Sequence, residues 1–113
     1  MAGIYIHIPF CKQACSYCNF HFSTNAKHRK ELLEGILHEI NQRADFFKDE
    51  SINSIYLGGG TPSILDQSEL SQIFEQLELN FELGKLKEVT LEANPDDLSR
   101  KKLKELKGTP INR

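Results

Sequence analysis

The chain lacks a long hydrophobic run and any excess of charge of one sign. Its early apolar stretch, Ile4 to Phe10, is interrupted by His7 and Pro9 and is too short for a spanning helix or a secretion signal. A formal net charge of -2 gives no electrostatic reason to expect nucleic acid or a membrane surface as a partner. We therefore expect a cytoplasmic protein of one domain, without stable membrane insertion and without a nucleic-acid partner.

The chain has three cysteines and lacks a fourth. Cys11, Cys15 and Cys18 form a C-x3-C-x2-C pattern in a segment rich in turn formers and aromatic residues. An odd number argues against a disulfide framework, and thiols are the default state of cytosolic cysteines. A lone cysteine is usually a small buried hydrophobic residue. Three so close together instead indicate a site for a metal or a cluster.

Two kinds of site fit three cysteines. Structural zinc takes four ligands, usually from two paired knuckles. His21 or His7 would supply the fourth ligand here, but no second knuckle follows downstream. Iron–sulfur clusters are held by cysteine thiolates, normally one for each iron. Three cysteines on a four-iron cluster leave one iron open to another molecule, and at this point both interpretations stand.

The hydrophobic pattern predicts three repeats of a strand followed by a helix. We expect strands over about 3–8, 54–57 and 88–93, and helices over about 26–47, from about 66, and over about 99–106. The expected helix boundaries are Thr24 or Asn25 before the first helix, a capping-box pair of Asp66 and Glu69, and Gly108 after the third helix. This alternation predicts an α/β fold of three consecutive βα units with parallel strands.

The first and third predicted strands have one apolar and one polar face. Isoleucines at 4, 6 and 8 alternate with Tyr5 and His7, and Glu92 lies on the polar face of the third strand. A parallel strand covered on both sides is apolar on both. The polar face is therefore either exposed at a sheet edge or part of a polar cavity in a curved sheet or barrel, whose active site lies at the carboxyl ends of the strands. The cysteine segment, the run 58–60 and the turn 94–97 all follow such ends.

The second strand is followed by the sequence GGGTP, from Gly58 to Pro62. Glycines let a ligand approach the backbone, because no Cβ is in the way. The run has neither the lysine of a phosphate-binding Walker loop nor the spacing of a dinucleotide-binding fingerprint. By itself it is equally typical of a tight turn. Beside an open-iron cluster it becomes a candidate clamp for the cluster's ligand.

Three segments together resemble the radical S-adenosylmethionine (SAM) enzymes. They are YIHIPFCKQACSYCNF (5–20), YLGGGTPSIL (56–65) and EVTLEANPDDL (88–98). The cysteine pattern with an aromatic residue before its last cysteine is typical of the superfamily. YIHIPFC and GGGTPS indicate the branch that contains oxygen-independent coproporphyrinogen III oxidase and the heme chaperone HemW.

The resemblance implies that Cys11, Cys15 and Cys18 hold a [4Fe-4S] cluster whose fourth iron is chelated by SAM. It further implies the SAM contacts Tyr5, Gly59, Gly60, Thr61 and Glu92, and it assigns no catalytic residue. In the family, an electron from the reduced cluster cleaves SAM to a 5′-deoxyadenosyl radical that abstracts hydrogen. An electron donor such as flavodoxin or ferredoxin is therefore an implied partner.

Two departures from the oxidase pattern separate the branches. The oxidase typically carries a further cysteine where this chain has Phe20, and a substantial extension before the residue that matches Tyr5. Both departures favour a HemW-like heme chaperone, which binds heme and hands it to acceptor proteins. The alternative is oxidative decarboxylation of coproporphyrinogen III to protoporphyrinogen IX. Porphyrin or heme is thus the implied substrate or cargo, with heme-acceptor proteins as partners.

The length of the chain limits what it holds. A complete β/α barrel needs about 250 residues, and residues 110–113 lead into the fourth strand in the family. We therefore expect 1–113 to be the N-terminal part of a radical SAM partial TIM-type barrel, without the heme or substrate site and inactive alone.

Overall fold

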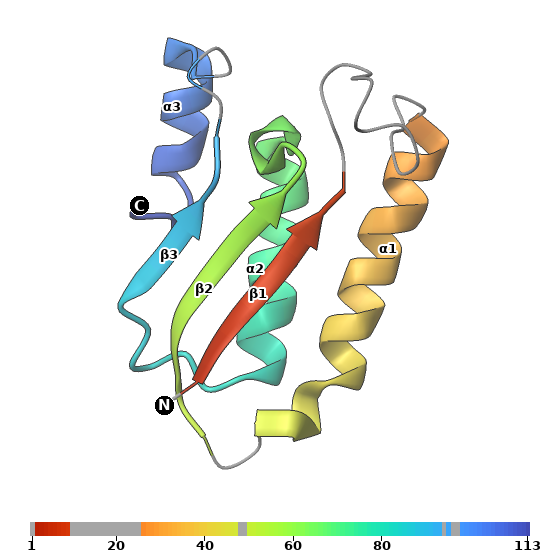
Figure 1. The fold of residues 1–113 in the computed structure, drawn as a ribbon, viewed down its shortest axis with the longest axis vertical. Coiled ribbons are helices and arrows are strands. Elements are labelled where there is room, and N and C mark those ends of the chain that lie inside the picture. The colour runs from red at the N-terminus through yellow and green to blue at the C-terminus, as the bar shows by residue number, and fades with distance from the viewer. Residues whose placement is uncertain (1, 10–25, 48–49, 94, 96–97) are drawn as a thin grey trace.

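The structure of the protein is a computed structural model that describes residues 2–9, 26–47, 50–93, 95 and 98–113. One parallel sheet contains β1 (Ala2–Ile8), β2 (Ile52–Gly59) and β3 (Glu88–Leu91) in that spatial order. The helices α1 (Ala26–Gln42), α2 (Gln67–Asn80) and α3 (Arg100–Lys107) follow the strands in turn (Figure 1). There are also two 3-10 helices: η1 (Ala44–Phe47) lies between α1 and β2 along the chain, and η2 (Pro62–Ile64) lies between β2 and α2. The predicted α/β fold of three βα units is confirmed.

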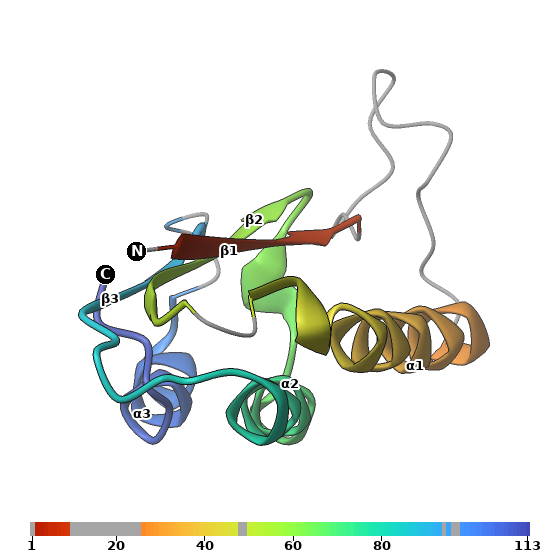
Figure 2. The same cartoon turned by 90° about the horizontal axis from the view of Figure 1, so that it is seen from below.

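All three helices lie on one side of the sheet (Figure 2). The apolar face of the strands packs against them, as the alternation in the sequence predicts. The core comprises Ile6, Ile8, Leu33, Ile40, Ile52, Ile55, Leu57, Leu65, Leu70, Ile73, Phe74, Leu77, Val89 and Leu91. Each large aliphatic side chain buried in this way stabilises the fold by about 1.5–3 kcal/mol. The opposite face carries the exposed Tyr5 and His7, so the polar face remains open among the described residues.

The helix boundaries at α2 and α3 follow the capping pattern in the sequence. Asp66 accepts a hydrogen bond from the Glu69 backbone N–H (2.8 Å), and the Glu69 side chain accepts one from the Asp66 N–H (2.9 Å). Ser99 caps α3 by accepting from the Lys102 N–H, and Gly108 ends the helix. Each such cap satisfies N–H groups that the first helical turn leaves without a partner, which fixes where the helix starts.

Four predicted boundaries were wrong, and one of them is the start of β2, which lies at Ile52 rather than Ser54. The α-helix predicted over 26–47 ends at Gln42, and η1 follows. Ala44 and Phe47 are spaced by three, a period that a 3-10 helix shares, and helix ends often tighten in this way. β2 runs on through Gly58 and Gly59 because its backbone pairs with β1 up to Ile8. β3 ends at Leu91, although the Glu92 N–H still donates to the Leu57 carbonyl (3.0 Å).

The last residues pair with the outer edge of β3. The N–H groups of Asn112 and Arg113 donate to the Val89 carbonyl (2.9 and 3.1 Å), and the Leu91 N–H donates to the Arg113 carbonyl (3.0 Å). Arg113 thus bonds the residues on both sides of Thr90, which is the hydrogen-bond pattern of a parallel pair of strands. These bonds satisfy part of the outer edge of β3, which is the last strand of the three-stranded sheet. Among the described helices, none combines the length and the apolar character needed to cross a membrane.

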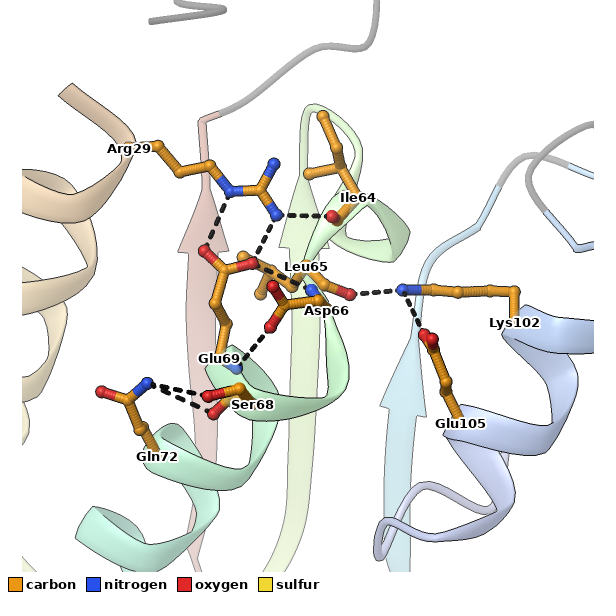
Figure 3. A network of polar contacts seen from close by, with 9 residues as sticks. All are labelled: Arg29, Ile64, Leu65, Asp66, Ser68, Glu69, Gln72, Lys102 and Glu105. Carbon is orange, nitrogen blue, oxygen red and sulfur yellow. Dashed lines mark hydrogen bonds and ion pairs between the residues drawn. The ribbon is translucent and has the colours of Figure 1, made fainter. Parts of the chain in front are cut away.

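A polar network joins the three helices at the carboxyl end of the sheet (Figure 3). Arg29 of α1 bonds the Glu69 carboxylate of α2 and the Ile64 carbonyl, while Lys102 of α3 donates to the Leu65 carbonyl. Burial acts to raise the pKa of Glu69, but the hydrogen bonds from Arg29 and from the Asp66 N–H hold it below its ordinary value of 4.5. The charged carboxylate is therefore the form that this network stabilises.

We expect this network to make the stability of the folded protein depend on pH in the acid range. A lowered folded-state pKa contributes stability that is present above 4.5 and is lost as the pH falls through the folded-state pKa of Glu69. Glu69→Gln should therefore lower the melting temperature at neutral pH, with a difference from wild type that shrinks in acid. Thermal unfolding followed by circular dichroism across the acid range measures this.

Glu39→Gln is the matched control, because the Glu39–Arg43 pair is exposed at the far end of α1, with 63% of both side chains accessible. Exposed pairs of this kind contribute about 0–1 kcal/mol, so its melting curve should stay close to wild type. A constant difference between Glu69→Gln and wild type at every pH would contradict the expectation.

Candidate functional site

The glycine run forms a corner that joins the carboxyl ends of two strands. Gly59 has φ +115°, a conformation that side chains with a Cβ rarely adopt. A Cβ there would also lie 2.7 Å from the Ile8 carbonyl oxygen. The Gly60 N–H donates to that same carbonyl at 2.8 Å. The end of β1, from which the cysteine segment departs, is thus fixed directly against the run.

Glu92 closes the corner from the third strand. Its Oε1 accepts a hydrogen bond from the Gly59 N–H at 2.9 Å, and its own N–H continues the bonding to β2. Glu92 is exposed on the open face of the sheet. Glu92 follows the edge strand β3 and is exposed, so both readings of this residue, an edge position and part of a polar cavity, stay predictions. The backbone of the glycine run thus holds one oxygen of this carboxylate.

An aromatic pair lies beside this carboxylate. Tyr5 and Tyr56 are opposite each other in the β1–β2 register, and their rings stack with centroids 5.7 Å apart and planes at 20°. The Tyr5 hydroxyl and the His7 Nδ1 form a hydrogen bond of 3.2 Å. Partial desolvation, together with the nearby Glu92 carboxylate, raises the pKa of Tyr56, so this phenol stays protonated. Tyr5 is 58% exposed on the open face.

Gly58 lies under the point where these side chains meet. A Cβ on Gly58 would be 2.5 Å from the Glu92 Oε1, 2.8 Å from the Tyr56 ring and 2.9 Å from the Tyr5 hydroxyl oxygen. Gly58 is itself buried. The absence of a side chain therefore allows the three groups to converge over the end of β2.

The structure brings together most of the predicted contact residues that it describes. Tyr5, Gly59, Gly60 and Glu92 share one corner at the carboxyl end of the sheet. Thr61 follows immediately, but it is buried (7% exposed), and its carbonyl accepts from the Ile64 N–H. It therefore lies at the base of the corner rather than on the open face.

The structure does not describe most of the predicted metal ligands. Cys11, Cys15, Cys18 and His21 lie outside the described residues, as does most of the turn 94–97. His7, the other zinc candidate, bonds Tyr5. No group of three or more metal-binding side chains exists within the part of the chain that the structure describes.

Sequence reasoning missed one member of the corner, Tyr56, and included Gly58 only as part of the glycine run. Tyr56 lies between the apolar residues Ile55 and Leu57, so the alternation along the strand would have placed it on the polar face. Its pairing with Tyr5 depends on the register between two strands, and residues far apart in the sequence carry no local signal of that register.

The donor set suits a small zwitterionic ligand. A carboxylate held by one hydrogen bond is a natural partner for an ammonium group. The glycine backbone allows close approach, and the exposed phenol of Tyr5 adds a further polar group. The residues of the corner therefore fit the amino-acid end of SAM. The three thiols fit an iron–sulfur cluster by their chemistry, since thiolates are the usual ligands of such clusters.

A groove of about 370 Å³ lies between β1 and α1, and Leu77 and Phe81 also line it. Its lining is mostly aliphatic, with Glu39 and Arg43 on the helix side and the backbone of β1 opposite. It touches Tyr5 and His7, yet neither the glycine run nor Glu92 lines it. The convergence of polar groups, rather than this groove, marks the candidate site.

Comparison with protein families decides the assignment. The model of the radical SAM superfamily matches residues 5–113. This chain belongs to the radical SAM superfamily. The matched range contains the cysteine pattern, the glycine run and Glu92, which are the segments that carried the resemblance in the sequence.

Relatives of this radical SAM chain have two named activities. The heme chaperone HemW of Buchnera aphidicola (Schizaphis graminum strain) is 35% identical over 98% of this chain and 30% of its own length. The oxygen-independent coproporphyrinogen III oxidase of Salmonella typhimurium is 30% identical over 98% of this chain and 25% of its own. The solved radical SAM enzyme HemN, coproporphyrinogen III oxidase of Escherichia coli, has a TM-score of 0.86 and 28% identity, covering 98% of this chain and 26% of that one.

The radical SAM chain thus spans less than a third of these relatives. Its fold matches the corresponding part of HemN, which confirms the predicted relation to the radical SAM barrel. The activity of the whole protein, its cargo and its partners are matters for proposal.

Proposed function

We propose that this chain carries the cluster-binding and SAM-binding part of a HemW-like heme chaperone. The observation that carries the proposal is the corner in which Gly59 bonds Glu92 beside the exposed Tyr5. The corner stands next to the end of β1, and the cysteine segment continues from that end. Family membership supports a [4Fe-4S] cluster on Cys11, Cys15 and Cys18 over the zinc alternative, because the same segments match the superfamily.

Each residue of the corner takes a specific part in this proposal. The Glu92 carboxylate accepts a hydrogen bond from the ammonium group of SAM while it also accepts one from the Gly59 N–H. Tyr5 contacts the same ligand from β1. Gly59, Gly60 and Thr61 shape the backbone against which the methionine end lies. Cys11, Cys15 and Cys18 would hold the cluster, which would supply the electron for cleavage of SAM once a donor such as flavodoxin or ferredoxin had reduced it. The residues described here orient the ligand and leave the chemistry to the cofactors.

Two observations favour the chaperone over the oxidase. The position two residues after Cys18 is Phe20, where the oxidase typically has a cysteine. The HemW proteins of Buchnera aphidicola (Schizaphis graminum strain) and Bacillus subtilis are 35% identical to this chain, while the HemW of a second Buchnera strain is 30% identical, as is the Salmonella oxidase. We therefore propose heme as cargo and heme-acceptor proteins as partners. Coproporphyrinogen III oxidation remains the second candidate, supported by the fold match to HemN.

We expect the full-length gene product, reconstituted anaerobically with iron and sulfide, to bind heme and to pass it to a heme-free acceptor protein. Heme binding is measured by its Soret absorption, and transfer by recovery of the acceptor. With coproporphyrinogen III, SAM and a reductant, we expect no decarboxylated product. Formation of protoporphyrinogen IX that depends on both SAM and reductant would instead establish the oxidase.

A further inference from the structure

Tyr56 is the member of the corner to which the proposed function gives no part. It lies on the middle strand β2, with Tyr5 opposite it on β1 and Thr90 opposite it on β3. Its side chain is 39% exposed and does not belong to the core under the sheet. The contacts of this ring are therefore with side chains on the open face.

The Tyr56 ring has a site residue on each side. It stacks on Tyr5, with the ring centroids 5.7 Å apart and the planes at 20°. A Cβ built on Gly58 would lie 2.8 Å from Tyr56 Cε1. The same Cβ would lie 2.5 Å from Glu92 Oε1 and 2.9 Å from the Tyr5 hydroxyl oxygen. The three side chains are thus near neighbours, and Tyr56 comes from the strand between the other two.

The Glu92 side chain depends on its neighbours for its orientation. It directly follows the last residue of the edge strand β3, and it is exposed. The Gly59 N–H donates to its Oε1 at 2.9 Å. A glutamate has three rotatable side-chain bonds, and fixing all of them when a ligand binds opposes binding. A tyrosine ring has two and is ordered at a lower entropic cost. A stacked ring beside the carboxylate therefore restricts Glu92 before the ligand arrives.

We propose that Tyr56 is a positioning residue for the ligand of the corner: its ring, held by Tyr5, keeps the Glu92 carboxylate turned toward Gly59, in the orientation that receives an amino group. The proposal rests on the proposed function, in which Glu92 binds the amino end of SAM, and it involves only residues that the structure describes. Tyr56 acts through Glu92 and needs no contact with SAM. A carboxylate that is already oriented binds more tightly, because less ordering remains to be done.

The ring of Tyr56, rather than its hydroxyl, has this role. The stack on Tyr5 is a ring contact, and the atom nearest to the Gly58 position is the ring carbon Cε1. Partial desolvation and the nearby Glu92 raise the pKa of Tyr56, so the phenol is uncharged and does not repel the carboxylate. Tyr56→Phe should therefore keep the function, and an aliphatic side chain should lose it.

The test compares Tyr56→Val, Tyr56→Phe and Thr90→Val in the full-length gene product, reconstituted anaerobically with iron and sulfide. Valine favours strands as tyrosine does, so Tyr56→Val removes the ring with little change in strand propensity. Thr90→Val is the matched control, because it places the same side chain opposite Tyr56 on the strand that lies away from Tyr5. Iron and sulfide content, melting temperature and SAM affinity by equilibrium dialysis are measured for each. Tyr56→Val is also measured in a Glu92→Ala background.

We expect Tyr56→Val to retain iron and sulfide but to bind SAM about tenfold more weakly. Tyr56→Phe and Thr90→Val should stay within about threefold of wild type. In the Glu92→Ala background, Tyr56→Val should cause no further loss of SAM affinity, because the group through which it acts is gone. An equal loss in both backgrounds would reduce Tyr56 to a structural role and overturn the proposal, as would wild-type SAM affinity in Tyr56→Val.

The remaining outcomes are also decisive. If Tyr56→Val does not fold, Tyr56→Leu takes its place, and failure of both to fold makes the ring a requirement of the fold and overturns the proposal. A SAM affinity as low in Tyr56→Phe as in Tyr56→Val assigns the effect to the hydroxyl and also overturns it. If wild type binds no SAM, the proposed function itself fails. If wild type binds SAM and Glu92→Ala binds it equally well, the positioning role alone fails.

Discussion

Replacing any one of Cys11, Cys15 and Cys18 by alanine is expected to abolish stable assembly of a four-iron cluster. Each iron normally needs a thiolate or another ligand, and the open iron already has none from the protein. The chain holds no other cysteine that substitutes. The measurement is iron and sulfide content, with the visible absorption of the cluster, after anaerobic reconstitution of the full-length gene product.

Ser16→Ala is the matched control, because it lies between two of the cysteines and carries no thiol. It should take up iron and sulfide like wild type. Full cluster content in Cys15→Ala would show that the ligand assignment is wrong. Tight uptake of one zinc by wild type, with no iron, would revive the zinc interpretation.

Gly58→Ala is expected to remove most SAM binding and to leave the cluster in place. The new Cβ would meet Glu92, Tyr56 and Tyr5 at 2.5 to 2.9 Å. These neighbours are side chains, which move more readily than backbone, so the fold survives while the corner is disarranged. We expect a loss of SAM affinity of at least about tenfold, equal to about 1.4 kcal/mol. Equilibrium dialysis and the SAM-dependent EPR change measure it.

Gly35→Ala is the control for the same chemical change. Gly35 lies within α1, and a Cβ there would meet nothing within 4 Å. Alanine in a helix interior should stabilise the protein by about 0.5–1 kcal/mol, without an effect on SAM. Glu92→Ala should weaken SAM binding in the same direction as Gly58→Ala. Wild-type SAM affinity in both Gly58→Ala and Glu92→Ala would refute the role of the corner.

Much of the fold was determined by the sequence alone. Alternating isoleucines beside Tyr5 and His7 predicted a strand with one buried face, and the structure has that strand over Ala2–Ile8. The capping pair of Asp66 and Glu69 placed the start of α2 correctly. Such features are local, because periodicity and capping depend on residues within one or two turns of each other. The cysteine spacing is local in the same sense, which is why it identified the superfamily.

The site required the tertiary structure. Nothing near Tyr56 in the sequence says that it stacks on Tyr5, since that contact follows from the register between β1 and β2. Arg29 reads as one more charge on a helix surface, and its partner Glu69 lies 40 residues away. Even Glu92, which the resemblance had implied, gained its bond to Gly59 only through the pairing of β2 with β3. Contacts between distant segments are set by how the strands and helices pack together, and a pattern along the chain does not contain that information.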